Sequence, residues 1–149
     1  METGEKSHTL RNVAIGVIVI IAVLVIYKNL RTSTDPSPQT TEILTPESFA
    51  VPAGQIQYFS FTLTGLGRVV GRFQASGGSG NDIEAVITNA DGFENWKNGH
   101  EARVFYQSGK VTVGNINTSL VRGTYYLAFN NRFSVLTDKT IVSNIVLVH

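Results

Sequence analysis

The sequence predicts an all-β fold: one antiparallel β-sandwich of about seven or eight strands, preceded by one N-terminal transmembrane helix. An apolar block, Val13–Tyr27, stands near the start of the chain, and beyond Ser48 apolar residues recur with a period of two. Short turn sequences separate the alternating runs, and no long helical pattern interrupts them. We therefore expect a tail at 1–9, a transmembrane helix at 10–30, a linker at 31–46 and a sandwich domain at 47–149.

The apolar block carries no charged residue. Residues 13–27 would span only about 22 Å as a helix, whereas residues 10–30 span about 31 Å, which matches the hydrocarbon core of a bilayer. Arg11 and Lys28 fall inside the longer span, and their long stems can reach the headgroups. The anchor residues that we single out are Val13, Ile18, Ile21, Leu24, Ile26 and the interfacial Tyr27.

Two alternatives to a membrane anchor exist. A cleaved signal peptide would also begin with a basic stretch and a short apolar run, but no small-x-small cleavage site follows here. The second alternative is a buried core helix, but a run that is apolar on every face and rich in Val and Ile would be unusual for a helix of a soluble protein. The charges that flank the apolar block, Lys6 and Arg11 before it and Lys28 and Arg31 after it, nearly balance. We expect a signal-anchor with the N-terminus cytoplasmic and the sandwich extracytoplasmic, periplasmic or extracellular.

Composition excludes several classes of protein. The formal net charge is +1, and residues 47–149 hold eight Lys/Arg and seven Asp/Glu, so we expect no nucleic-acid partner. The absence of cysteine rules out disulfides, thiolate zinc sites and a cysteine nucleophile. The linker is rich in Thr, Ser and Pro, which is typical of an extended spacer, or of a segment that lies along a partner.

Alternation defines the expected strands. The inward-facing residues of the first long strand are Phe59, Phe61 and Leu63, and three later runs repeat this pattern around Phe73, Ile87 and Leu127. The last strand, 140–148, is apolar on both faces, so it is either central or covered by a partner. The turn sequences that separate the strands include Gly65-Leu66-Gly67, Gly77–Gly80, Asp91-Gly92, Asn98-Gly99 and Ser108-Gly109.

Five segments within 48–149 follow one another in a recognisable order: Val51–Gly54 before Tyr58–Phe61, then Asn81–Ile87, Tyr106–Gly109 and Gly123–Phe129. In these segments the sequence resembles extracellular β-sandwich modules, namely the bacterial pre-peptidase C-terminal domain and the GOLD domain of secretory cargo proteins. The resemblance implies a jelly-roll-like sandwich that serves adhesion, carbohydrate contact or protein contact without catalysis. GOLD-bearing receptors place the domain before the anchor, and pre-peptidase domains follow a protease, so the resemblance bears on the fold rather than on either family's biology.

Asp82 and Glu84 are the candidate metal ligands. Carboxylates two apart on a strand point the same way, so they could share a cation such as calcium, with Asn81 and Asp91 adding oxygens. The alternative is a solvated junction between loop and strand. The three histidines, His8, His100 and His149, are not spaced for a metal.

Aromatic residues are the candidate binding residues, above all Trp96, Phe93 and Tyr126, with Tyr106 and Tyr125 in the wider set. Trp96 lies in a polar stretch, 91–99, that we expect to form a loop. An aromatic residue in such a loop can anchor an interface or stack on a sugar. The alternative is that Trp96 plugs the edge of the sandwich.

No motif points to catalysis. There is no nucleophile elbow, and the Gly-rich stretch 77–80 precedes a strand rather than the helix that a phosphate-binding loop requires. Asn117-Thr118-Ser119 is a glycosylation sequon to which we assign no role.

We therefore expect a protein that is not an enzyme and has no cofactor: an accessory or structural subunit of a larger membrane-protein complex, of the respiratory, photosynthetic, secretion or transport kind. Its expected partners are the lipid bilayer and other membrane-protein subunits. The alternative is a membrane-tethered surface module that binds carbohydrate or peptide.

Overall fold

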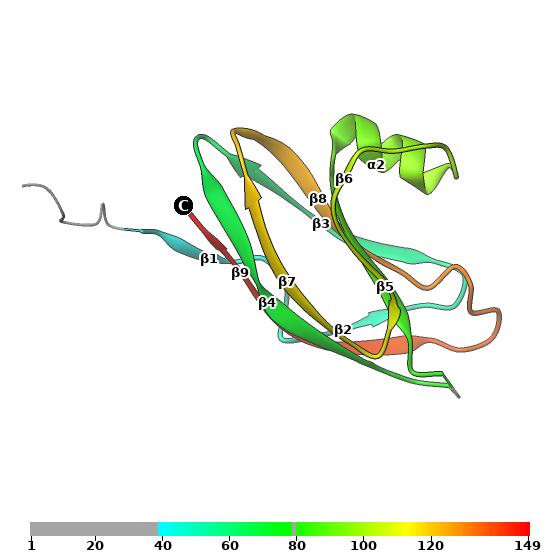
Figure 1. The fold of residues 1–149 in the computed structure, drawn as a ribbon. Coiled ribbons are helices and arrows are strands. Elements are labelled where there is room, and N and C mark those ends of the chain that lie inside the picture. Colours follow the sequence, from blue (N-terminus) through cyan, green and yellow to red (C-terminus); the bar gives the residue numbers. More distant parts are fainter. Residues whose placement is uncertain (1–38, 79) are drawn as a thin grey trace, which may run out of the picture. The chain divides into compact units, whose positions relative to one another are not determined.

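The computed structural model describes residues 39–78 and 80–149, which form two antiparallel β-sheets and one short helix (Figure 1). In chain order the elements are β1 (Thr41–Ile43), β2 (Ser48–Val51), β3 (Ile56–Leu63), β4 (Gly67–Ser76), β5 (Ile83–Asn89), α2 (Ala90–Lys97), β6 (Val104–Val111), β7 (Val113–Leu120), β8 (Gly123–Asn130) and β9 (Lys139–Val148). The prediction of an antiparallel β-sandwich is confirmed for this part of the chain.

The strand order explains how the two layers are connected. One sheet has the order β1-β9-β4-β7, with β2 also paired to β9, and the other has the order β3-β8-β5-β6. From β2 to β9 the chain changes sheet at every connection except that between β5 and β6. This order is jelly-roll-like. The two sheets pack against each other through a shared apolar core.

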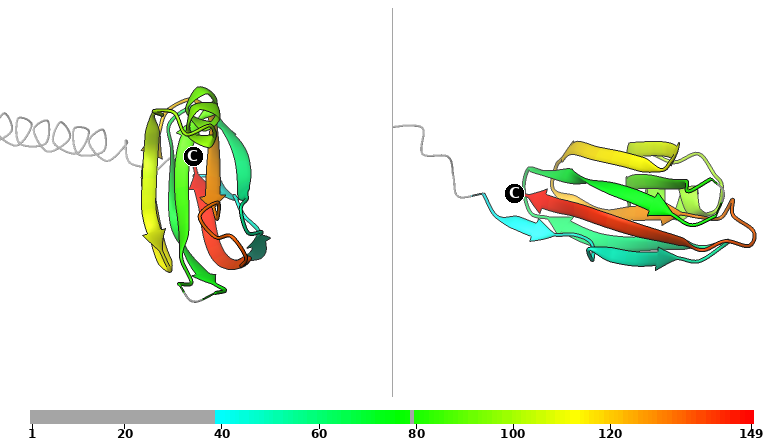
Figure 2. Two further views of the ribbon diagram at one scale, coloured as in Figure 1. Left: turned by 90° about the vertical axis from the view of Figure 1, so that its right-hand side faces the viewer. Right: turned by 90° about the horizontal axis from the view of Figure 1, so that it is seen from below.

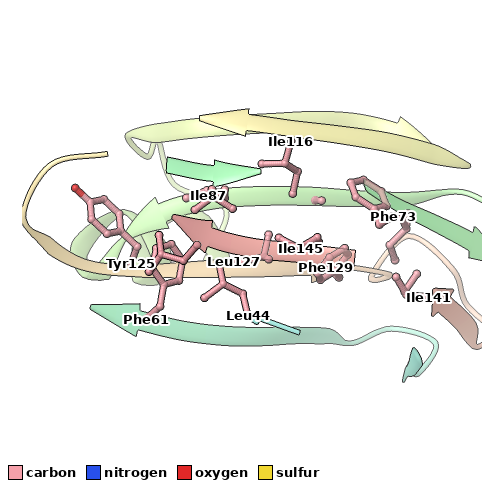
Figure 3. Close-up of a cluster of buried hydrophobic side chains, with 14 of the residues drawn as sticks. Leu44, Phe61, Phe73, Ile87, Ile116, Tyr125, Leu127, Phe129, Ile141 and Ile145 are labelled. Carbon is pink, nitrogen blue, oxygen red and sulfur yellow. The ribbon is translucent and has the colours of Figure 1, made fainter. Parts of the chain in front are cut away.

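The core lies between the sheets and is built from the inward-facing residues that alternation predicts. Phe61 of β3, Phe73 of β4 and Leu127 of β8 are all buried (Figure 3). Leu63 of β3 is buried as well. Phe73 meets Phe129 edge to face, with 5.4 Å between the ring centroids. Such aromatic pairs add stability beyond the apolar area that they bury.

β9 is a central strand, as the first of the two explanations expected, and a partner over its outer face stays a prediction. It pairs with β4 along one side and with β1 and β2 along the other. Ile141, Ile145 and Leu147 enter the core, whereas Val142 on the outer face is exposed.

The folded part begins earlier than residue 47. Thr40 and His149 exchange two backbone hydrogen bonds, of 2.7 and 3.0 Å, and β1 then pairs with the end of β9. Leu44 joins the core, and the buried Thr45 hydroxyl lies 2.9 Å from that of Ser143. Residues 40–45, assigned to the linker from their composition, thus complete one edge of a sheet.

The Ser108-Gly109 pair forms a bulge within β6 rather than the expected turn. Ala85 of β5 faces both residues, because the register shifts between Glu84, paired with Lys110, and Val86, paired with Gln107. Gly109 adopts a φ of +64°, and the Ser108 hydroxyl accepts a 2.8 Å hydrogen bond from the Ala85 amide. A glycine with positive φ is typical of such a bulge. The strand then continues to Val111.

The expected loop at 91–99 was also wrong, because residues 90–97 form helix α2. Asn89 caps the helix, its side-chain oxygen accepting a 2.9 Å hydrogen bond from the Gly92 amide. Asp91 lies in the first turn and Lys97 in the last, where each charge suits the helix dipole. The Asp91-Gly92 pair therefore falls inside the helix and not at a turn.

The predicted tail, the transmembrane helix at 10–30 and half of the predicted linker, residues 31–38, lie outside the described residues. Within 39–78 and 80–149, no helix has both the length and the apolar character needed to cross a membrane.

Candidate functional site

Four aromatic side chains gather on the outer face of the β3-β8-β5-β6 sheet. Tyr58 of β3 and Tyr126 of β8 point outward there because they alternate with core residues, and Phe93 and Trp96 come from α2. The Phe93 and Tyr126 rings stack with centroids 4.6 Å apart, and the Tyr58 ring centroid lies 4.9 Å from Phe93 and 5.8 Å from Tyr126. We call Tyr58, Phe93, Trp96 and Tyr126 the aromatic patch.

Burial separates the roles of the four rings. Phe93 is only 4% exposed, so it holds α2 on the sheet and forms the floor of the patch. Tyr58 is 49% exposed, and Trp96 and Tyr126 are half-buried. The Trp96 ring centroid lies 6.3 Å from that of Phe93. The accessible rings are therefore Tyr58, Trp96 and Tyr126, resting on a packed base.

Cations and amides border the patch. An open depression of about 440 Å³ lies beside Tyr58 and is lined by Gln55, Ile56, Tyr58, Phe93, Lys97, Asn98 and Arg132. The Lys97 ammonium lies 5.5 Å from the Phe93 ring centroid and 2.8 Å from Glu94, while Arg132 donates a hydrogen bond to the Lys97 carbonyl. This combination of rings, cations and amides is suited to binding, and the depression contains no nucleophile paired with a base.

The structure brings the three predicted binding residues together and leaves two other aromatics elsewhere. Tyr125 is buried in the core, and its hydroxyl donates a 3.0 Å hydrogen bond to the Val121 carbonyl. Tyr106 packs against the core from β6, and burial raises the pKa of its phenol. Neither residue belongs to the patch.

Tyr58 and Arg132 were missed in the sequence. Tyr58 could have been found, because it has the outward phase of a strand whose alternate residues enter the core. Arg132 could not, because it follows β8 and reaches α2 only through the fold.

The two candidate metal ligands have separate partners. Glu84 accepts hydrogen bonds from Gln107 and Asn130, at 2.7 and 2.8 Å. Asp82 lies 3.5 Å from the ammonium of the buried Lys139, which also donates a 2.7 Å hydrogen bond to the Gly77 carbonyl. Lys139 thus supplies a positive charge beside Asp82.

In the part of the chain that the structure describes, no group of three or more metal-binding side chains comes together. A cation shared by Asp82 and Glu84 stays a prediction. Calcium titration of the protein tests it.

A second depression, of about 470 Å³, opens on the other sheet where the edge strand is interrupted between β1 and β2. It is lined by Ile43, Thr45, Glu47, Arg72, Phe73, Gln74, Val142, Ser143 and Asn144. Its accessible charges are one arginine and one glutamate, and no cluster of rings comparable to the aromatic patch surrounds it. We therefore take the aromatic patch as the candidate site.

Neither a family model nor a curated protein matches the chain. Among solved structures, the chain is similar to PliG, a periplasmic inhibitor of g-type lysozyme from Aeromonas hydrophila, at 8% identity and a TM-score of 0.38, over 78% of this chain and 90% of that one. It is also similar to the carbohydrate-binding module CBM29-2, at 11% identity and a TM-score of 0.37, over 74% of this chain and 91% of that one.

A third similar structure is the carbohydrate-binding module CBM36 in complex with calcium and xylotriose, at 11% identity and a TM-score of 0.29, over 76% of this chain and all of that one. At such low identities and TM-scores, these similarities assign no family, ligand or partner to this chain.

Proposed function

We propose that this chain is a membrane-anchored, non-catalytic accessory subunit of a larger membrane-protein complex, and that its sandwich binds a protein partner through the aromatic patch. The observation that carries the proposal is the grouping of three accessible rings, Tyr58, Trp96 and Tyr126, on a buried base. Tyrosine, tryptophan and arginine are the residues that most often dominate the energy of a protein interface.

The geometry of the patch supports protein contact. Its rings are held by packing against Phe93 and the sheet, so little side-chain freedom is lost when a partner binds. Lys97 and Arg132 lie at the border, where charges favour the right partner and the right orientation more than they add affinity.

The anchor and the location of the domain are supported by the sequence. Residues 10–30 have the length and the apolar character of a membrane span, and a signal-anchor would place the sandwich on the extracytoplasmic side. Respiratory, photosynthetic, secretion and transport complexes all contain subunits of this organisation, and a binding surface beside an anchor suits any of them.

Copurification tests the proposal. The full chain, extracted from membranes in mild detergent, should migrate with a constant set of partners. Tyr58→Ala and Trp96→Ala should each lose them, because removing an interface anchor costs about 2 kcal/mol or more, roughly 30-fold in affinity. The matched control is Val142→Ala, an exposed position on the opposite sheet, which should retain the partners.

Thermal unfolding separates an interface role for Trp96 from a packing role. A fully buried tryptophan would cost about 3 kcal/mol or more of stability on truncation, and the half-buried Trp96 should cost clearly less. Retention of all partners by both patch variants, or a large stability loss at Trp96 with partners retained, would overturn the proposed interface.

Carbohydrate binding is the second candidate, and the depression beside Tyr58 favours it. An exposed tyrosine ring next to the amides of Gln55 and Asn98 offers a stacking face and hydrogen bonds to hydroxyl groups. Trp96 is the single tryptophan of the chain, so its fluorescence reports on the patch. A saturable emission change with soluble polysaccharides, absent in Tyr58→Ala, would favour this function over protein contact.

A further inference from the structure

The start of the described chain and two turns with exposed apolar tips lie at the same end of the sandwich. Thr40 is hydrogen-bonded to His149, and the next positions form a row across the sheet in which Thr41 pairs with Val148, Val148 with Arg68, and Arg68 with Ser119. The tether from the predicted anchor therefore joins the domain at this end.

The two turns lie side by side. Residues 64–66 join β3 to β4, and residues 121–122 join β7 to β8. Leu63 pairs with Gly123 and Gly67 with Leu120, so both ends of one turn are strand neighbours of both ends of the other. Figure 2 shows both turns at the end that holds the C-terminus.

An apolar side chain stands at the tip of each turn. Leu66 is 79% exposed and Val121 is 61% exposed. Two adjacent apolar tips leave a surface that water solvates poorly, and such a surface favours contact with an apolar medium.

Arginines follow both tips. Arg68 comes two residues after Leu66, and Arg122 comes directly after Val121; both are exposed, and neither turn contains an acidic residue. Arg122 also lines an open depression of about 360 Å³ together with Arg103 and Asp91. Apolar tips backed by arginine match the interface of a bilayer, where the headgroup region accepts the apolar tips and the phosphates accept hydrogen bonds from the guanidinium groups.

The tether between the predicted membrane span and the domain is short, so this end of the domain stays within reach of the bilayer. Residues 31–39 connect the predicted span to Thr40, and nine residues extend at most about 30 Å. We propose that this end of the sandwich rests on the lipid surface, with Leu66 and Val121 inserted among the headgroups and Arg68 and Arg122 beside the phosphates. The proposal rests on the proposed membrane anchor.

The opposite end supplies a matched control. Leu136, in the connection between β8 and β9, is 91% exposed, as apolar as Leu66, and separated from the tether end by the length of β9. Ten strand residues span about 33 Å. The aromatic patch lies on a flank of the domain, so lipid contact at the tether end leaves the patch free for a partner.

The experiment uses the full chain, which has no cysteine, reconstituted in vesicles of phosphatidylcholine and phosphatidylglycerol. Single variants Leu66→Cys, Val121→Cys, Leu136→Cys and Ile18→Cys are labelled with an environment-sensitive fluorophore. We expect blue-shifted emission at residues 66 and 121, with quenching by lipids that carry a nitroxide near the headgroup, and water-like emission without quenching at residue 136.

Each outcome bears on one proposal or on both. Water-like emission at residues 66 and 121, together with a lipid-buried probe at residue 18, overturns the lipid contact and leaves the anchor in place. Water-like emission from a probe at residue 18 contradicts the proposed membrane anchor and, because the lipid contact rests on it, the lipid contact as well. Gly65→Cys, where an added Cβ meets nothing within 4 Å, repeats the test if Leu66→Cys does not fold.

The arginines have a test of their own. Arg68→Gln with Arg122→Gln should reduce the blue shift at residue 121 in vesicles that contain phosphatidylglycerol, and should change it little in pure phosphatidylcholine. If the blue shift at residue 121 in anionic vesicles is the same with and without the two arginines, the arginines do not contact the phosphates.

Discussion

Gly92 controls how closely helix α2 approaches the sheet. A Cβ at this position would lie 2.1 Å from the Thr88 hydroxyl oxygen and 2.7 Å from the Arg103 carbonyl oxygen. These two groups are themselves joined by a 2.6 Å hydrogen bond, so neither can move away without losing its partner. The absence of a side chain at Gly92 therefore allows Phe93 to reach the sheet and form the base of the aromatic patch.

Lys139 carries a buried positive charge that neighbouring polar groups compensate. Its side chain is buried at the start of β9, and its ammonium holds together the Gly77 carbonyl and Asp82, two groups from the connection that precedes β5. Buried charges are tolerated in proteins when they are paired and hydrogen-bonded.

Replacing Lys139 with methionine should destabilise the domain. The Gly77 carbonyl would lose its donor and Asp82 its nearby cation, and leaving such groups without partners costs about 1–3 kcal/mol. Urea unfolding of the full chain in detergent, followed by Trp96 fluorescence, measures the loss. Lys110→Met, at an exposed position, is the control and should change the stability by less than about 1 kcal/mol. Equal stabilities of the two variants would contradict the structural role of Lys139.

Helix α2 is the element on which the candidate site depends. It is only eight residues long, and helices of that length are not stable alone. The Asn89 cap, the pair between Glu94 and Lys97, and the burial of Phe93 together hold it on the sheet. Two of the four rings of the aromatic patch lie on this helix, so its stability determines whether the patch forms.

Removing the cap should loosen this helix. Asn89→Ala deletes the acceptor for the Gly92 amide and should cost about 1 kcal/mol, whereas Asn89→Ser keeps an acceptor and should cost much less. The melting temperatures of the two variants give the comparison. If alanine and serine are equally stable at residue 89, the capping hydrogen bond does not contribute as we propose.

On the scale of the whole molecule, the sandwich presents different surfaces in different directions. The outer face of one sheet carries the aromatic patch, the outer face of the other exposes Val142, and one end carries Leu66 and Val121 beside the tether. If the proposed anchor holds the domain at a membrane, all three surfaces are available at the same time. The orientation of that proposed anchor then decides which compartment they face.

We expect residues 39–149 on the extracytoplasmic side. Because the chain has no cysteine, Ser37→Cys and Thr3→Cys introduce single thiols on either side of the predicted span. A membrane-impermeant maleimide added to intact cells should label residue 37, and residue 3 should react only after permeabilisation. The reverse pattern would place the sandwich in the cytoplasm.

The sequence by itself determined where most of the strands lie and which of their residues enter the core. Alternation is a local property, because successive side chains of a strand point to opposite faces, and it correctly placed Phe61, Phe73 and Leu127. The sequence also singled out Trp96, Phe93 and Tyr126 as candidate binding residues, because aromatic residues in a polar context often lie in interfaces.

Only the tertiary structure decided which strands pair and what covers them. Residues 41–43 were assigned to the linker because they are exposed and pair only with β9, about a hundred positions away. Residues 90–97 were expected to form a loop because the stability of helix α2 comes from the sheet beneath it. Tyr58 and Arg132 approach this helix only through the fold. Local pattern cannot encode such contacts, because their energy arises from burial between segments that are distant in the sequence.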